Sequence, residues 1–404
     1  MTIAIYHARL IDGTGAVHER ATLVVRGSKI SAVGPSRTLT IPKGARRING
    51  RGLTILPGLI DCHVHLCLGG EADVVGALES EHPSLTLLKS ASYAKATLNA
   101  GFTTVRDVGA RDHSIFALKQ AVDSGLLPGP RIIGAGLAIC MIGGHARFIG
   151  QEVEGTEQVR QAVLEQIAAG AGVIKVIASG GVLTPGTSPD EAQMTMEELS
   201  AAVDAARQAE KKVAAHAHGA CGMRNAILAG VRSIEHATLL DEEAGTLMKR
   251  YGVYMVPTLS ALATTAACRP SCGIPESALD KAKAMTKRHK VSFKSAHQGG
   301  ISIAMGTDAG TPFNYHGENA QELERMVALG MTTMEAIVAS TATAARLIGI
   351  QDSVGRLTRG MEADLVILKG NPLQRIDVLR DGDKIMGVMK AGTFVSGPLA
   401  HSDS

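Results

Sequence analysis

The chain has little of what a surface for nucleic acids or long sugar chains needs. Among its 404 residues there is no tryptophan, aromatic residues make up 3%, and the formal net charge is +3. Proteins that bind nucleic acids usually combine stacked aromatic side chains with clustered positive charge. We therefore expect no nucleic-acid or other polyanionic partner.

Signals for membrane insertion and export are also missing from the sequence. No run of about 18 apolar residues occurs, the length that a membrane-spanning helix needs. Residues 1–6 lack the basic region and apolar stretch of a signal peptide. The six cysteines include no C-x-x-C pair and no zinc-finger spacing, a pattern typical of free thiols in a reducing compartment. We expect a cytoplasmic protein that does not contact a membrane.

The central part of the sequence alternates strand-like and helix-like patterns. Amphipathic stretches such as residues 157–169 and 196–210 lie between short apolar runs. This alternation is typical of parallel β/α units. Eight strands are expected, at residues 55–65, 103–108, 131–137, 173–179, 213–218, 233–238, 254–259 and 301–307.

The two ends of the sequence predict a second, smaller domain. Short apolar runs separated by turn signals fill residues 2–53, and the tail repeats this style. We expect residues 1–54 and 355–404 to form one composite β domain, and residues 55–354 to form the α/β domain. A chain of this length can bury a large core in such an arrangement.

Two His-x-His pairs stand at the ends of predicted strands. His63 and His65 end the apolar run that begins at residue 54, and His216 and His218 end a later run. In a strand, residues i and i+2 point the same way, so each pair projects toward one point. Neutral imidazole is the commonest transition-metal ligand. The pairs therefore predict metal ligation.

Three other strands offer further ligand types. His236 and Asp308 lie at strand ends, and Lys175 lies inside the apolar run of residues 173–177. Burial is costly for a charged lysine and lowers its pKa. A neutral amine can react with carbon dioxide to give a carbamate, an anion able to bridge two cations.

A closed barrel of eight parallel strands brings all of these strand ends together. Barrel active sites lie at the carboxyl ends of the strands, where every candidate ligand is expected. An open doubly wound sheet is the alternative. It would keep the first and last strands apart, and the sequence lacks a G-x-G-x-x-G turn after a first strand.

These motifs resemble those of the amidohydrolase superfamily of metal-dependent hydrolases. The resemblance implies a (β/α)8 TIM barrel with a small β-sandwich built from the N- and C-terminal segments. Other segments resemble more narrowly the imidazolonepropionase-like group, which contains prolidases (Xaa-Pro dipeptidases) and zinc carboxypeptidases. The superfamily motifs are residues 57–65, 174–176, 216–219, 233–236 and 306–308, and those of the group are residues 101–109, 143–145 and 256–259.

The resemblance implies a site with two divalent cations, for which the nitrogen-rich ligand set favours zinc. Asp308 would also take a proton from the metal-bridging hydroxide that attacks the substrate, and deliver it to the leaving amine. Family members are often octameric, so a homo-oligomer is implied. The implied ligands are His63, His65 and Asp308 for the first cation, His216 and His236 for the second, and carbamylated Lys175 as the bridge.

Four more residues are candidates for contact with the substrate. His218 shares a strand face with His216, and His145 follows two glycines on the loop after the third strand; both are also candidate catalytic groups. Arg147 could pair with a substrate carboxylate, because guanidinium binds carboxylates bidentately. His316 lies on the loop after the eighth strand and could line the mouth.

The implied activity is hydrolysis of an amide or peptide bond in a dipeptide or N-acyl amino acid, as in prolidases and carboxypeptidases, or in an ochratoxin-type amide. A cyclic-amide hydrolase of the imidazolonepropionase kind, or a deaminase, is the alternative; such relatives typically lack the lysine ligand and use one metal. A non-enzymatic scaffold is the third hypothesis, although scaffold relatives typically have degraded ligands, whereas this sequence retains the full set.

Several polar residues near these motifs are expected to serve structure alone. Asp61 and Glu235 alternate with ligands and should point away from the centre, and Arg106 and Asp107 should form an internal ion pair or cap the backbone. The remaining histidines have no strand-end context and are expected at the surface or in the core; they are His7, His18, His82, His113, His289, His297 and His401.

Overall fold

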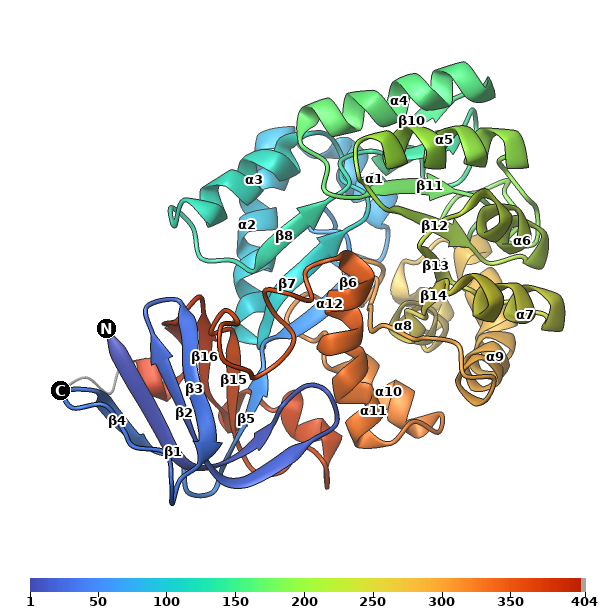
Figure 1. Ribbon diagram of the computed structural model, residues 1–404. Helices are drawn as coiled ribbons and strands as arrows, with labels where there is room; N and C mark the ends of the chain where they lie inside the picture. The colour runs from blue at the N-terminus through green and yellow to red at the C-terminus, as the bar shows by residue number, and fades with distance from the viewer. Residues whose placement is uncertain (401–404) are drawn as a thin grey trace.

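The two ends of the chain meet in one eight-stranded sheet. The computed structural model describes residues 1–400, so His401 and the last residues of the expected β domain lie outside the described part. The sheet has the order β17-β16-β15-β5-β1-β2-β3, with β4 beside β1, and it lies at one end of the molecule together with the N-terminus (Figure 1). Its strands are β1 (Thr2–Ile11), β2 (Val17–Arg26), β3 (Lys29–Pro35), β4 (Arg46–Asn49), β5 (Leu53–Pro57), β15 (Leu365–Lys369), β16 (Ile385–Lys390) and β17 (Thr393–Ser396).

Strand β5 holds the sheet together, because it pairs with β1 on one side and with β15 on the other. Successive side chains of a strand point to opposite faces. Ile55 accordingly packs in the core of the sheet, whereas Leu56 packs in the main core of the barrel. In β15, Ile367 faces the first core and Val366 the second. The expected β structure built from both chain ends is confirmed, as one continuous sheet with two apolar faces.

Eight parallel segments form the barrel, seven of them regular strands or parts of strands (Figure 1). β8 and β9 follow each other in the third segment, and β10 (Gly150–Val153) pairs with β9 at the edge. The expected TIM barrel is confirmed. Its strands are β6 (Leu59–Val64), β7 (Phe102–Asp107), β8 (Arg131–Gly134), β9 (Ala138–Met141), β11 (Ile174–Ile177), β12 (Val213–Ala217), β13 (Ser233–His236) and β14 (Tyr254–Val256).

Residues 301–309 form the eighth segment and close the barrel without making a regular strand. The Met255 amide donates to Ser302 O on the β14 side, and the Cys62 amide donates to Met305 O on the β6 side. The Asp308 amide donates to His63 O at 2.7 Å. Asp61 adds a side-chain link, accepting hydrogen bonds from the amide and the hydroxyl of Thr307. The first and last segments therefore meet, as a closed barrel requires.

Helices surround the barrel, and 3-10 turns fill several of the loops (Figure 1). Thr195 and Thr332 begin α5 and α11 with capping boxes, in which the glutamate three residues later returns the hydrogen bond. The helices are α1 (Val74–Ser80), α2 (Pro83–Asn99), α3 (Ser114–Asp123), α4 (Gly155–Ala169), α5 (Met196–Gln208), α6 (Ala220–Ala229), α7 (Glu242–Tyr251), α8 (Leu259–Ala266), α9 (Glu276–Gln298), α10 (Gln321–Ala328), α11 (Thr333–Ala339) and α12 (Ala342–Ile348).

The expected first strand, residues 55–65, divides at Gly58 into β5 of the sheet and β6 of the barrel. At this crossing the Gly58 amide donates to Asp364 O at 2.7 Å. A Cβ atom on Gly58 would lie 2.9 Å from the Cβ of Thr103, whose side chain is buried. Glycine is therefore required for the close approach of β7 to the crossing. The domain boundaries expected at residues 54 and 355 remain predictions.

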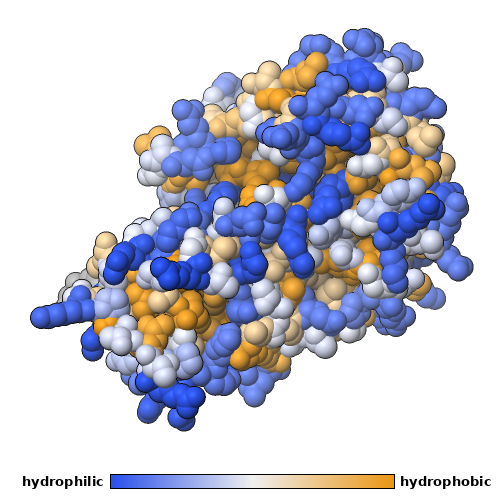
Figure 2. All heavy atoms as spheres, in the orientation of Figure 1, coloured by the Kyte–Doolittle hydropathy of each residue, from blue (hydrophilic) through white to orange (hydrophobic). Residues whose placement is uncertain are grey.

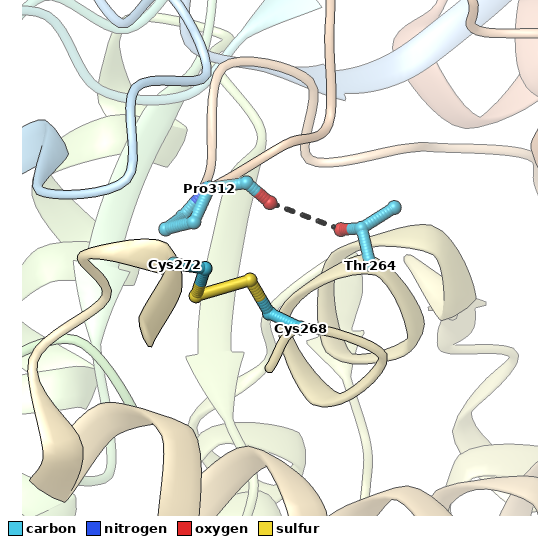
Figure 3. The surroundings of a disulfide bond; sticks show 4 residues. All are labelled: Thr264, Cys268, Cys272 and Pro312. Atoms are coloured by element: carbon cyan, nitrogen blue, oxygen red, sulfur yellow. Dashed lines mark hydrogen bonds between the residues drawn. A yellow bond between two sulfur atoms is a disulfide. The ribbon is translucent and has the colours of Figure 1, made fainter. Parts of the chain in front are cut away.

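A disulfide joins Cys268 and Cys272 in the connection between α8 and α9 (Figure 3). The expectation of free thiols is wrong for this pair, so the cysteines no longer indicate a reducing compartment. The other four cysteines are free. Within residues 1–400, no helix combines the length and the apolar character needed to cross a membrane.

Polar side chains cover much of the face shown in Figure 2, and apolar ones gather in patches, one of them over the sheet at the lower left. The most exposed large apolar side chains are Met1, Leu126 and Leu88, none of which is a candidate metal ligand. Scattered apolar exposure of this kind is normal at a protein surface.

Replacement of Gly58 by alanine should lower the free energy of unfolding by about 1–3 kcal/mol, the usual cost of overpacking a filled site. The added methyl group must displace Thr103 or the backbone beside it. Denaturant titration measures this change. Gly382→Ala is the control, because a Cβ on Gly382 meets no atom within 4 Å. Equal midpoints for the two variants would contradict the steric role of Gly58.

Candidate metal centre

A cavity opens at the carboxyl ends of the barrel strands. Eight of the titratable residues singled out in the sequence line it, and all eight are buried. They come from different strands and loops, and the closed barrel brings them together. These residues are His63, His65, His145, Lys175, His216, His218, His236 and Asp308.

His63, His65 and Asp308 form a first group, with one possible ligand atom from each within 4.8 Å of the others. Nε2 of His63 lies 3.4 Å, and Nε2 of His65 lies 3.2 Å, from Oδ1 of Asp308. The other ring nitrogen of each histidine, Nδ1, contacts a group outside the cavity. Nδ1 of His63 lies 2.7 Å from Glu235 Oε2, and Nδ1 of His65 lies 2.8 Å from the carbonyl oxygen of Gly109. Both Nε2 atoms are thus directed at one point.

His216, His218 and His236 form a second group within the same 4.8 Å limit. The ring centroids of His218 and His236 are 4.7 Å apart and stacked, and the ring of His236 lies 5.0 Å from that of His63. The two groups are therefore neighbours. His218, expected to contact the substrate, occupies a ligand-like position in the second group.

Each ring of the second group also has one nitrogen engaged, which fixes its orientation. His216 differs from the other two, because its Nε2 is engaged and its Nδ1 remains for a ligand. The outer contacts are His216 Nε2 to Gly180 O at 3.2 Å, His218 Nδ1 to Thr238 Oγ1 at 2.7 Å, and His236 Nδ1 to Thr258 Oγ1 at 2.7 Å.

Lys175 is the unusual member of the site. It lies in the middle of β11, and its Nζ is buried without a hydrogen-bond partner among the described residues. Burial lowers the pKa of Lys175 to about 8. A buried polar atom that lacks a partner in a native fold calls for an explanation, such as a missing ion or a modification. The amine therefore fits a site completed by further groups.

The electrostatics of the site suit cation binding. Burial, reinforced by neighbouring positive charges, holds the pKa values of His216, His218 and His236 well below the ordinary value, so these rings carry lone pairs at neutral pH. Burial alone would raise the pKa of Asp308, but His63, His65 and Lys175 outweigh it and lower the value to about 2. The second group is thus neutral, and the first contains an anion.

The pKa values of the two imidazoles in the first group shift in opposite directions. Burial and the charge of Lys175 lower the pKa of His63 to about 4. Burial would also lower the pKa of His65, but its hydrogen bond to Asp308 and the charge of that carboxylate outweigh burial and raise it. Metal binding would remove any proton from His65.

Glu235 supports His63 from behind, a role not anticipated from the sequence. Arg106 Nη2 donates to both Glu235 oxygens, at 2.8 and 2.9 Å, and Ser233 Oγ donates to Oε1 at 2.5 Å. Burial would raise the pKa of Glu235, but Arg106 and His63 outweigh it and hold it well below its usual range. The internal ion pair expected for Arg106 is therefore present, with Glu235.

The expectation that Glu235 points away from the centre is wrong, because the alternation of β13 fails at His236. His236 has φ 71° and Ala237 has φ 49°, both in the left-handed region. As a result Glu235 and His236 both contact His63. One sequence signal was available, since a buried arginine in β7 needs an acidic partner.

The four candidate substrate contacts have different outcomes. His145 is in the cavity, with its ring 4.6 Å from His216 and its Nδ1 2.9 Å from Thr184 Oγ1. His218 is in the cavity as described. Arg147 is exposed and does not line the cavity.

Local backbone geometry explains the position of Arg147. Ala146 has φ 62° and leads into a 3-10 turn, Arg147–Ile149. This turn directs Phe148 and Ile149 to the cavity and Arg147 to solvent.

His316 does not line the cavity either. Its Nε2 donates to the carbonyl oxygens of Leu68 at 3.0 Å and His65 at 3.2 Å, and its ring stacks on Tyr93. His316 therefore holds the loop behind the first group.

The rest of the cavity wall is apolar apart from two threonines. Within the described residues no arginine lines it, and no carboxylate besides Asp308 does. The larger apolar side chains of the wall are Leu68, Val108, Phe148, Ile149, Ile177, Val182, Leu183 and Leu262.

The chain is similar to known enzymes over nearly its full length. The model of the amidohydrolase family matches residues 54–395. Ochratoxinase from Aspergillus niger is 32% identical over 429 aligned residues, which cover 98% of this chain and 86% of that protein. A solved Xaa-Pro dipeptidase with methionine bound in its active site is 36% identical, with a TM-score of 0.92, over 98% of this chain and 100% of that one. A prolidase complexed with N-methylphosphonate-L-proline is 32% identical, with a TM-score of 0.92, over the same shares.

Glu235→Gln should weaken metal binding by about 10–100-fold, the usual effect of losing an outer partner of a ligand. The amide keeps the shape but removes the negative charge that balances Arg106 and supports His63. Competition with a chelating dye measures the affinity. Glu243→Gln on α7 is the control, because its carboxylate is exposed. Unchanged affinity in Glu235→Gln, with normal circular dichroism, would contradict this role.

Proposed function

This chain belongs to the amidohydrolase family, and from that premise we propose that it is a hydrolase with two metal ions that cleaves the amide bond of a dipeptide or an N-acyl amino acid. The observation that carries the proposal is the buried Nζ of Lys175, which has no hydrogen-bond partner within residues 1–400 and lies beside two groups of ligand atoms. A carbamate on this amine would supply the anionic bridge that a pair of divalent cations needs.

The donor set fits this cofactor. His63, His65 and Asp308 would hold one cation, His216 and His236 would hold the other, and modified Lys175 would touch both. Zinc suits ligands of this kind. Bound divalent cations would lower the pKa of a water molecule and polarise the substrate carbonyl.

Asp308 is the residue suited to move the proton. Its lowered pKa keeps it ionised at neutral pH, and it faces the interior of the site beside His63 and His65. An ionised carboxylate there can accept a proton from the attacking water and return it to the leaving amine.

His145 and His218 are suited to orient the substrate. Each has Nδ1 engaged by a threonine hydroxyl, which leaves Nε2 for the cavity. With Arg147 outside the cavity, these two rings and the cations are the groups available to meet a substrate carboxylate. The apolar wall favours substrates with an apolar side chain.

The relatives support the same substrate class. One solved relative is a Xaa-Pro dipeptidase with methionine bound in its active site, and another is a prolidase complexed with N-methylphosphonate-L-proline. Ochratoxinase is a further relative. We further propose that the chain forms a homo-oligomer and acts in the cytoplasm.

The substrate class is tested with a panel of dipeptides and N-acyl amino acids, each as the free acid and as the carboxyl-terminal amide. The metal-loaded protein should cleave apolar members best and prefer free acids, since an unpaired buried group costs about 2–5 kcal/mol in comparable sites. Asp308→Asn should lower kcat by about 100-fold or more. Absence of amide cleavage throughout the panel, or an unchanged rate in Asp308→Asn, would refute the proposed function.

Lys175→Ala should lose the second metal and the activity together, because the bridge is removed. Only the neutral form of the Lys175 amine reacts with carbon dioxide. In the metal-free chain the neutral fraction of this amine grows as pH rises through about 8. At a fixed concentration of dissolved carbon dioxide, reconstitution with metal should therefore be faster at about pH 9 than at about pH 7. Elemental analysis and activity measure both effects. Two metals and normal turnover in Lys175→Ala would contradict the bridge, and one metal in the native protein would favour the cyclic-amide hydrolase.

A further inference from the structure

Lys281 on α9 makes an unusual set of contacts with the loop that follows β11. Its Nζ donates to the carbonyl oxygens of Gly181 at 3.3 Å, Thr184 at 3.0 Å and Thr187 at 2.6 Å. An ammonium group has three donors, so this one loop uses all of them. The group is half-buried, and its burial lowers its pKa.

The loop segment 181–187 forms part of the proposed substrate site. Val182 and Leu183 line the cavity. Thr184 Oγ1 lies 2.9 Å from Nδ1 of His145 and accepts a hydrogen bond from the Ala146 amide at 3.2 Å. A Cβ atom on Gly181 would lie 2.3 Å from Nε2 of His145, so the backbone of the segment approaches that ring closely. The position of the segment therefore sets both the wall and the imidazole.

Apart from Lys281, the polar links among the described residues between the segment and the rest of the site are the two contacts of Thr184 Oγ1 with His145 and Ala146. Thr187 Oγ1 donates to Thr184 O at 3.1 Å, a contact inside the segment itself. Val182 packs in a cluster with Leu262 of α8 and Leu279 of α9, and Leu183 packs against it. Apolar contact is not directional, whereas the three hydrogen bonds of Lys281 fix the segment along the helix.

Helix α9 provides a firm base for these contacts. The disulfide between Cys268 and Cys272 closes the connection from α8, and Thr264 Oγ1 donates to Pro312 O at 3.1 Å beside it (Figure 3). Both cysteines pack against the same apolar cluster as Val182. The cavity wall from α8 and the helix that carries Lys281 are thus joined.

We propose that Lys281 is a positioning residue for substrate selection: it holds segment 181–187 and, through it, Val182, Leu183 and His145. The effect of Lys281 on substrate selection rests on the proposed amide hydrolysis. The hydrogen bonds by which Lys281 positions segment 181–187 do not depend on that function. Lys281 does not line the cavity, so it acts through the loop and not by contact with substrate.

The test is Lys281→Met, which keeps the length of the stem and removes the charge and the donors. Lys283→Met is the matched control, because Lys283 is exposed two residues along the same helix. Hydrogen exchange of the amides of segment 181–187 should become at least about tenfold faster in Lys281→Met alone. Metal content should stay that of the native protein. This measurement needs no substrate.

With substrates, Lys281→Met should raise KM for the preferred apolar amide and reduce discrimination between large and small side chains by about tenfold, the scale expected on loss of charge-assisted hydrogen bonds. A purely structural role would lower thermal stability and change all substrates equally. Unchanged exchange in the segment would overturn the proposal. Faster exchange with unchanged discrimination would also overturn it, while faster exchange without amide cleavage in the native protein would refute only the proposed function.

Discussion

The hydrogen bonds that join β6 to residues 305–309 are the contacts on which the site depends. The first ligand group takes His63 from β6, His65 from just after β6 and its carboxylate from the eighth segment, so it exists only where these two edges meet. The segment is irregular, and Asp308 has φ 61°. Asp61 compensates by binding the backbone and side chain of Thr307, and it also accepts from Asn319 at 2.7 Å. A buried carboxylate thus replaces part of a regular strand ladder.

The outer partners of the rings make the two groups chemically different. His63 is backed by a carboxylate, whereas His216 is backed by a carbonyl and the other two rings of its group by hydroxyls. A carboxylate behind an imidazole makes it a more basic ligand. The first group also contains Asp308. It therefore offers more negative charge to a cation than the second group, which needs an added anion to match it.

The histidines and Asp308 could be found from the sequence because strand periodicity and barrel topology are local and general rules. Glu235 could not be placed correctly, since left-handed backbone at His236 breaks the alternation that the rule assumes. The exposed position of Arg147 and the disulfide could not be predicted for a similar reason. Their positions depend on a turn at Ala146 and on the path between α8 and α9, and neither follows from residue spacing. The polar contacts of segment 181–187 are likewise set by tertiary packing.

The pairing of β5 with β15 has a consequence for how the chain is made. Leu53 lies opposite Lys369, so more than three-quarters of the protein must leave the ribosome before this strand finds its neighbour. Until then β5 presents an unpaired apolar edge, which is a template for association with other chains. Contacts so distant along the chain also close slowly. Nascent chains that stop short of β15 would thus be clients for chaperones, although they contain every candidate metal ligand.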